Sequence, residues 1–345
     1  MNVLSLFDGI SCGRVALARA GIPVSTYYAS EIDKYAIQIA QKNYPDTIHI
    51  GDVKQIDFAK YKGLIDIIIG GSPCQDLSIA KRNRQGLHGE HSGLFWDYIK
   101  ALSVIKPKYY LLENVSSMKA TDRDTITDVL RAIYPETECI MINSALVSAH
   151  QRKRYYWTNW HVEQPQDKGI MMQDILEDGV TYQRKAYCIT ASYNQASFND
   201  TIKKHKRSMI CYPVPCAMRT RSDENGKSKR LEVKSDKKAN SLTSVQTDSM
   251  VCYTGNNPKA YRIYTVRDKS VRLKSDDSTE YKIDLPDGDY TVRKLTPVEC
   301  ERLQTLPDNY TEGVSNTHRY KAIGNGWTVD VIAHILSAIH NAKVQ

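Results

Sequence analysis

One cysteine and one glutamate are the residues whose types and positions could do covalent chemistry. Cys74 lies in Gly-Gly-Ser-Pro-Cys-Gln, directly after an apolar run, and Glu113 begins Glu-Asn-Val after another. A thiolate is a competent nucleophile, and nearby cations or a helix N-terminus lower the pKa of a cysteine. Because buried, inert cysteines are common at strand ends, position alone leaves Cys74 open between nucleophile and core residue.

Glu113 and two arginines could assist such a nucleophile. A carboxylate at the end of a buried strand could donate or share a proton with a substrate. Arg152 and Arg154 stand at alternate positions entering a predicted strand, so both side chains point to one face. One could bind a carbonyl oxygen of a substrate base while the other holds Glu113. The alternative is that both are ordinary surface cations.

Glycines and acids follow the first three predicted strands. Phe-Asp-Gly-Ile-Ser-Cys-Gly follows the first, and Gly9 and Gly13 allow a tight turn with close backbone approach. Glu31 follows the second strand, where an acid can bind ribose hydroxyls, and Asp52 follows the third, where it can accept from an adenine amine. Singly, each acid could be a helix cap or a surface residue. Together, at successive strand ends, they favour an adenosine cofactor.

The elements that would position these residues alternate as far as about residue 160. Apolar runs predict strands, and longer periodic segments between them predict helices. The strands are expected at 2–7, 25–30, 47–52, 64–71, 108–115, 138–145 and 154–160, and the helices at 13–21, 31–44, 92–106 and 121–134. This order predicts an α/β fold with a doubly wound mixed sheet.

The composition changes after about residue 163. We therefore expect a cofactor-binding domain at 1–163, an inserted, smaller, strand- and loop-rich domain at 164–290, and a return to the first domain at 291–345 with helices at 296–306 and 328–342. Residues 200–240 hold twelve Lys and Arg against five Asp and Glu. This segment is either a solvated insertion or a basic face for nucleic acid.

The composition of the whole chain further limits the classes of protein to which it could belong. The 345 residues carry a formal net charge of +8, which favours a polyanionic partner. No apolar run approaches the roughly 18 residues of a membrane span. The eight cysteines form no C-x-x-C pair and no cluster with metal spacing, which predicts free thiols and no metal. The missing G-x-G-x-x-G disfavours an NAD enzyme.

Taken in order, these motifs resemble the DNA cytosine-5 methyltransferase family. FDGISCG looks like the family's first motif, GGSPCQ its Pro-Cys motif, ENV its sixth, HQRKR its eighth, RKLTPVECERLQTLPDNY its ninth and AIGNGW its tenth. Two departures matter. Ser11-Cys12 replaces a second glycine of many bacterial members and, with VSAHQRKRYYW, is closer to the animal de novo branch. Gly326-Trp327 stands where Ser-Val is commoner, so only Asn325 is carried over there.

The resemblance implies roles for these residues. Cys74 would attack carbon 6 of a cytosine flipped out of double-stranded DNA, Glu113 would engage ring nitrogen 3 and the exocyclic amine, and Arg154 would bind the base carbonyl, with Arg152 beside it. The methyl donor would be S-adenosylmethionine (AdoMet). The residues expected to bind it are Phe7, Asp8, Gly9, Ile10, Gly13, Glu31, Ile32, Asp52, Val53, Pro73, Leu94 and Asn325.

DNA contacts are expected from two segments. The polar stretch after Cys74 is interpreted as a mobile loop that closes over the flipped base. The inserted segment, which corresponds in position to the family's target-recognition domain, supplies a basic cluster. The residues concerned are Gln75, Ser78, Lys81, Arg82 and Arg84 in the loop, and Lys203, Lys204, Lys206 and Arg207 in the cluster.

Two rival functions share this scaffold. A tRNA cytosine-5 methyltransferase would carry a smaller insertion than the roughly 125 residues present here. A catalytically silent DNA-binding paralogue would lack some of the motif residues. We expect a monomer in the cytoplasm of a prokaryotic or phage-infected cell, bound to the nucleoid through DNA. It would be an orphan enzyme or be paired with a restriction endonuclease that acts separately.

Overall fold

The chain divides into two compact units. The computed structural model describes residues 1–72, 93–181, 183–194 and 288–341, together with shorter strand segments between 208 and 282. The first unit comprises residues 1–170, 187–196 and 297–345, and the second comprises 171–186 and 197–296. Residues 164–170 and 187–196, which we expected in the insertion, therefore belong to the first unit. The second unit ends at 296 rather than at 290.

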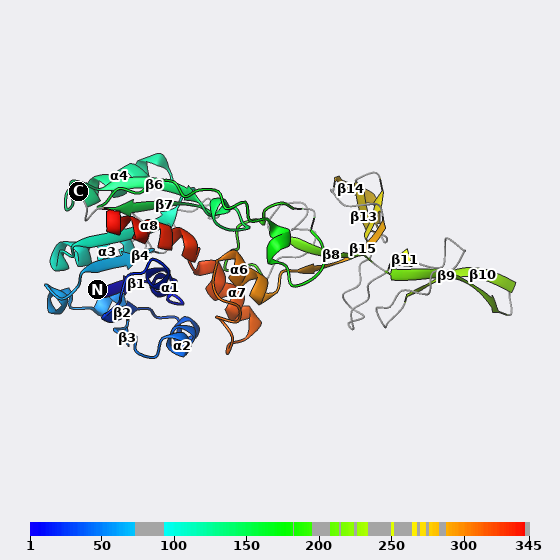
Figure 1. Cartoon of the computed structure of the whole chain (residues 1–345), viewed down its shortest axis with the longest axis horizontal. Coiled ribbons are helices and arrows are strands. Elements are labelled where there is room, and N and C mark those ends of the chain that lie inside the picture. Colours follow the sequence, from blue (N-terminus) through cyan, green and yellow to red (C-terminus); the bar gives the residue numbers. More distant parts are fainter. Residues whose placement is uncertain are drawn as a thin grey trace. The chain divides into compact units, whose positions relative to one another are not determined.

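A seven-stranded mixed sheet forms the centre of the first unit (Figure 1). Its order is β3-β2-β1-β4-β5-β7-β6. The pairs from β3 to β5 are parallel, whereas β7 runs antiparallel to both β5 and β6. The strands are β1 Asn2–Leu6, β2 Thr26–Ser30, β3 Ile48–His49, β4 Ile67–Gly70, β5 Tyr109–Val115, β6 Glu138–Asn143 and β7 Lys153–Thr158. The predicted doubly wound mixed sheet is confirmed.

Seven α-helices belong to the described part of the first unit. They are α1 Cys12–Arg19, α2 Lys34–Asn43, α3 Gly93–Ile105, α4 Ala120–Arg131, α6 Pro297–Leu303, α7 Asn316–Asn325 and α8 Val329–Asn341. Asp33 caps α2 by accepting from the backbone N–H groups of Tyr35 and Ala36. All but α7 were predicted.

Alternate residues of the central strands enter two separate apolar cores. Ile69 and Leu111 pack on one side with α1 and α8, while Ile68 and Leu112 pack on the other with α3 and α4. β4 and β5 are buried along their whole length, which explains their continuous apolar sequences. Covering both faces with helices leaves the carboxyl edge of the parallel strands available for a site.

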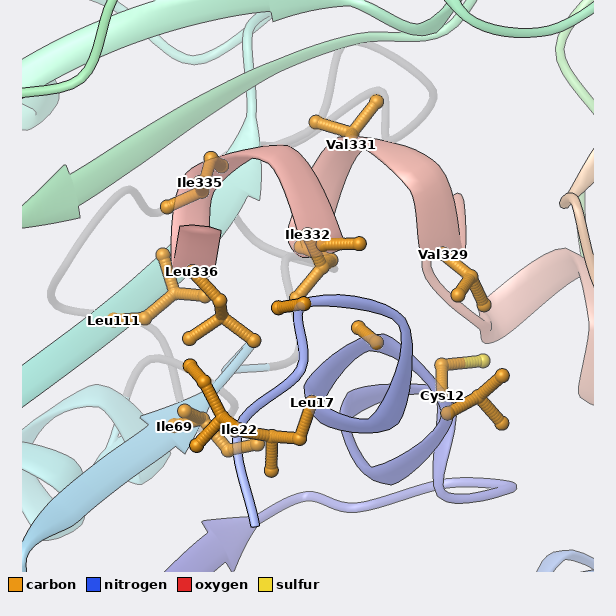
Figure 2. Close-up of a cluster of buried hydrophobic side chains, with 14 of the residues drawn as sticks. Cys12, Leu17, Ile22, Ile69, Leu111, Val329, Val331, Ile332, Ile335 and Leu336 are labelled. Atoms are coloured by element: carbon orange, nitrogen blue, oxygen red, sulfur yellow. The ribbon is translucent and has the colours of Figure 1, made fainter. Parts of the chain in front are cut away.

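Helix α8 contributes seven buried residues to one core (Figure 2). Its Ile332 and Leu336 lie against Leu17 of α1 and the sheet residues Ile69 and Leu111. Burying each such side chain stabilises the fold by about 1.5–3 kcal/mol. The stretch Asn316–Ile339 is long and apolar enough for a membrane span by composition, but 61% of its apolar window is buried inside the protein, as in a core helix.

The second unit is built from antiparallel strands. One sheet has the order β10-β9-β11 and the other β14-β13-β12-β15-β8. The strands are β8 Met209–Pro213, β9 Pro215–Asp223, β10 Gly226–Val233, β11 Met250–Val251, β12 Tyr264–Arg267, β13 Ser270–Leu273, β14 Asp276–Lys282 and β15 Gly288–Lys294. Short strands joined by turn-forming sequences are what the composition of this segment predicts.

Candidate active site

A cavity of about 350 Å³ opens at the carboxyl edge of the sheet. Its lining comes from segments that follow β1, β2, β3 and β4, from the end of β5, from the start of β7 and the residue before it, and from α2, α3 and α7. A crevice at this edge is where doubly wound sheets bind ligands. Among the predicted residues, those that line it are Phe7, Gly9, Ile10, Glu31, Ile32, Asp52, Val53, Leu94, Glu113, Arg152, Arg154 and Asn325.

Among the predicted cofactor residues that the structure describes, two do not line the cavity, namely Asp8 and Gly13. Asp8 is buried and accepts hydrogen bonds from the hydroxyls of Ser11 (2.5 Å) and Tyr27 (2.7 Å). Burial raises the pKa of Asp8 above its ordinary value. At Gly13 a Cβ atom would lie 2.4 Å from Cδ1 of Ile69, so this glycine allows α1 to pack closely on the sheet. Both residues support the loop after β1 from the interior.

The loop after β1 adopts a backbone that side chains rarely tolerate. Phe7, Gly9 and Ser11 have φ values of 59°, 58° and 59°. Such left-handed conformations cost free energy at non-glycine residues and occur frequently at binding sites. Here the turn directs the backbone N–H of Gly9 toward the carboxylate of Glu31.

Glu31 is held entirely by backbone groups near the turn. Its Oε2 accepts from the N–H of Gly9 at 2.8 Å, and its Oε1 accepts from the N–H groups of Ile32 and Asp33 at 2.8 and 2.9 Å. Asp52 likewise accepts from the backbone N–H of Lys54 at 3.0 Å, where it caps a short 3₁₀ helix. Asp52 therefore caps a short helix and also lines the cavity.

Glu113 is held by side chains from distant parts of the sequence. Nε of Arg154 lies 2.9 Å from its Oε1, and the indole Nε1 of Trp327 donates to its Oε2 at 3.1 Å. The side chains of Arg154 and Glu113 are only 17% and 11% exposed, so this ion pair is shielded from water. Because Arg154 pairs with Val115 across the antiparallel strands, it lies diagonally opposite Glu113 on the same face.

Arg152 has a different set of partners. It is buried and donates to the carbonyl oxygens of Ile189 (3.2 Å), Gly324 (3.4 Å) and Gly326 (2.9 Å). These carbonyls include those at the C-terminal end of α7, which attract a cation. From strand alternation we expected one of the two arginines to hold Glu113 and the other to bind a base carbonyl, without saying which. In the structure Arg154 pairs with Glu113, whereas Arg152 precedes β7 and lies among backbone acceptors. The contact of Arg154 with a base carbonyl, which the resemblance implies, stays a prediction.

Three residues at or near the cavity were missed from the sequence. Cys188, which does not line the cavity itself, lies 3.4 Å from Nη1 of the lining residue Arg152. Burial opposes ionisation of its thiol, but Arg152 and Arg154 outweigh this effect and lower the pKa of Cys188. Tyr35 of α2 and His318 of α7 also line the cavity, and they stack with ring centroids 3.5 Å apart. Each pair joins residues that are far apart in sequence, so no local motif predicts the contact.

The ends of β4 and β5 are linked beneath the cavity. Asn114 of the Glu-Asn-Val motif donates from Nδ2 to Oγ of Ser72 at 3.2 Å. Pro73, Cys74, Gln75, Ser78, Lys81, Arg82 and Arg84 follow directly and lie outside the described residues, as do Lys203, Lys204, Lys206 and Arg207. Within the described parts of the chain, no group of three His, Cys, Asp or Glu residues is arranged to hold a metal ion.

The sheet order and the cavity define a doubly wound α/β protein that binds its ligand at the carboxyl edge. The C-5 cytosine-specific DNA methylase family matches residues 1–341, and the chain belongs to this family. The resemblance inferred from the motifs is thereby confirmed, and the protein is an enzyme of the cytosine C5 methyltransferase type.

Relatives and solved structures agree with this assignment. The orphan methyltransferase M.SPRI of Bacillus phage SPR is 24% identical, over 98% of this chain and 97% of its own. The type II methyltransferase M.NlaX of Neisseria lactamica is 27% identical over 99% of each chain. The Entamoeba histolytica methyltransferase EhMeth has a similar fold, with a TM-score of 0.64 at 16% identity, covering 99% of this chain and 98% of that one.

Proposed function

We propose that this protein transfers a methyl group from AdoMet to carbon 5 of a flipped-out cytosine in double-stranded DNA, within a specific short sequence. The observation that carries the proposal is the fixed carboxylate of Glu113, which lines the cavity beside Gly71 and Ser72, two and one residues before Pro73-Cys74. A carboxylate held in this way can contact the polar edge of a cytosine without first being reoriented.

The cavity suits AdoMet in size and in chemistry. Its volume falls in the usual range for small-molecule sites. Glu31 presents a fixed carboxylate for ribose hydroxyls, Phe7 offers an aromatic ring, and Asp52 lines the same cavity. When bound there, AdoMet supplies an electrophilic methyl group.

The residues of the chain would perform the rest of the reaction. The thiolate of Cys74 forms a bond to carbon 6 of the cytosine, and this addition makes carbon 5 nucleophilic. Glu113 contacts ring nitrogen 3 and the exocyclic amine, where charge changes during the addition. After methylation, a water molecule takes the proton from carbon 5, the electrons of that C–H bond re-form the 5,6 double bond, and the thiolate of Cys74 leaves. Because carbon 6 is not accessible in a stacked pair, the base must leave the helix first.

The direct test is replacement of the nucleophile. Cys74→Ala and Cys74→Ser should abolish methyl transfer to DNA while AdoMet still binds, as measured by transfer of tritiated methyl groups and by calorimetry. Substantial turnover by the alanine variant would contradict the covalent mechanism. Parallel assays on tRNA distinguish the rival substrate: the proposal predicts transfer to DNA and none to tRNA.

The second unit is proposed to recognise the target sequence. Strands β9 and β10 form an antiparallel ribbon in which Arg219 pairs with Arg230, Thr220 with Lys229 and Ser222 with Lys227. A two-stranded ribbon fits the major groove of DNA, and its basic residues can neutralise phosphates.

Charge reversal tests this assignment. Replacing Lys227, Lys229 and Arg230 by Glu should weaken DNA binding and reduce the slope of log Kobs against log salt by about 0.9 for each phosphate that is no longer neutralised. The matched control reverses Lys60, Lys62 and Lys106, three exposed lysines of the first unit. Equal effects of the two triple variants would contradict a specific role for the ribbon.

The relatives leave two biological settings for such an enzyme. M.SPRI is named an orphan methyltransferase of a phage, and M.NlaX a type II methyltransferase of a bacterium. We propose that this protein acts as a monomer in the cytoplasm of a prokaryotic or phage-infected cell. A restriction endonuclease, where one is paired with it, would act as a separate protein.

A further inference from the structure

Trp327 makes a contact with Glu113 that no motif predicts. It lies between α7 and α8, 214 residues after Glu113 in sequence, and its Nε1 donates to Oε2 of Glu113 at 3.1 Å. The contact is partly buried and leads directly to the carboxylate that we place against the substrate base.

Two donors are needed to fix the orientation of this carboxylate. The terminal torsion of a glutamate is broad, so one hydrogen bond leaves its plane free to turn. Arg154 binds Oε1 and Trp327 binds Oε2, so each oxygen has its own donor from a different element. Both the position and the rotation of the carboxylate are then determined.

The surrounding backbone leaves room for this arrangement. A Cβ atom at Gly71 would lie 2.7 Å from Oε2 of Glu113 and 3.0 Å from Nε1 of Trp327. The first of these distances is shorter than real Cβ atoms show, and the second is tight. The hydrogen bond between Trp327 and Glu113 therefore requires the absence of a side chain at Gly71.

The indole of Trp327 is itself held in place. The carbonyl of the preceding residue, Gly326, accepts from Nη2 of Arg152 at 2.9 Å and from Nε2 of Gln304 at 3.1 Å. The ring also packs close to the start of α1, where a Cβ at Gly13 would lie 3.4 Å from Cζ3 of Trp327. Arg152 thus acts on Glu113 indirectly, through the backbone that carries Trp327.

We infer that Trp327 is a positioning residue for methyl transfer, which orients Glu113 toward the cytosine together with Arg154. The inference rests on the proposed role of Glu113 and adds the residue that completes its alignment. Trp327 acts by donating one N–H group, and its loss slows the reaction without weakening the binding of AdoMet or DNA.

Trp327→Phe removes the donor and keeps an aromatic ring. Its single-turnover rate on unmethylated plasmid DNA, at saturating AdoMet, should fall about tenfold, the effect of one hydrogen bond to a charged group. The affinities for AdoMet and DNA should stay within about twofold. Trp160→Phe is the matched control, because Nε1 of Trp160 also donates a buried hydrogen bond, to the carbonyl of Ile335. It should lower the melting temperature and leave the rate unchanged.

The same substitution in a Glu113→Ala background separates positioning from general damage. If Trp327 acts through Glu113, Trp327→Phe should slow the Glu113→Ala enzyme no further. An equal slowing in both backgrounds, or a wild-type rate in the single variant, would overturn the inference while leaving the role of Glu113 intact. A wild-type rate for Glu113→Ala would overturn the proposed role itself, and the inference with it. If the phenylalanine variant fails to fold, Trp327→Leu removes the same donor.

Discussion

The carboxylates of Glu31 and Glu113 line the same cavity but are held in opposite ways. Within the described parts of the chain, the hydrogen bonds to Glu31 all come from backbone N–H groups, two of them from the residues that follow it. Glu113 takes its contacts from Arg154 and Trp327, which lie on other elements and far away in sequence. A turn therefore fixes the first acid, and tertiary packing fixes the second.

This difference suits two tasks. Backbone groups of a rigid loop offer a constant binding surface, which is what recognition of a cofactor requires. An acid held by side chains depends on several elements being assembled together, and its two shielded contacts orient it for a reaction. We therefore propose that Glu31 contributes to the affinity for AdoMet and Glu113 to the rate of methyl transfer.

The largest effect is expected at Glu113. Glu113→Gln keeps the shape of the side chain but removes its charge and places an NH2 group against Arg154 or Trp327. The single-turnover rate should fall by about 10²–10³-fold, the usual loss when one preorganised electrostatic contact is removed. AdoMet affinity, measured by calorimetry, should not change. An unchanged rate would remove Glu113 from the reaction.

A smaller and different effect is expected at Glu31. Glu31→Gln sets an NH2 group against a backbone N–H donor and removes a charged acceptor for the ribose. AdoMet should bind about 10- to 100-fold more weakly, as for the loss of a hydrogen bond to a charged group. At saturating AdoMet the single-turnover rate should return close to that of the wild type. A rate that stays low at saturation would show that the two acids do not divide the tasks.

The smallest effect is expected for the ion pair of Asp33. This residue has both local backbone partners and a side-chain partner from a distant part of the sequence. It caps α2 and also lies 2.7 Å from Nζ of Lys321 on α7. Partial burial opposes its ionisation, but Lys321 and the backbone N–H groups of Tyr35 and Ala36 outweigh this and lower the pKa of Asp33 below 3.8. Because the folded pKa is depressed, the stabilisation is present above 3.8 and is lost as pH falls through the folded value.

Replacing Lys321 measures how much the ion pair with Asp33 contributes to the free energy of unfolding. Lys321→Gln should reduce the free energy of unfolding at pH 7 by at most about 0.5 kcal/mol, because the pair is largely exposed. The difference from the wild type should shrink as pH falls toward 3. Urea titrations at several pH values measure it, with Lys60→Gln as the exposed control. A difference that grows in acid would contradict the assigned ion pair.

Features fixed by local structure could be predicted from the sequence, and features fixed by tertiary packing could not. The strands, most helices and the cavity edge follow from local patterns, and Glu31 and Asp52 were found because acids follow successive strands. The contacts of Glu113 were not predictable, because Trp327 lies in a motif that departs from the common pattern and reaches Glu113 only after α7 and α8 have packed. That Arg154 rather than Arg152 holds Glu113 was unpredictable for the same reason, since strand alternation places both on one face without specifying their partners.

The return of residues 187–196 to the first unit also escaped prediction. Ile189 is fixed there by the guanidinium of Arg152, a contact between residues 37 positions apart. Polar composition alone placed this segment in the insertion. This long-range contact, which ties Ile189 to Arg152 at the site, has no local signal in the sequence.

The central claim, methylation of carbon 5 of cytosine in DNA, has one direct test. Bisulfite sequencing of DNA from a host without its own cytosine methylation, expressing either the wild type or Cys74→Ala, reports both the product and its sequence context. We expect 5-methylcytosine at one short sequence in the wild-type sample and none in the variant. Unmethylated DNA in both samples, or equal methylation in both, would contradict it.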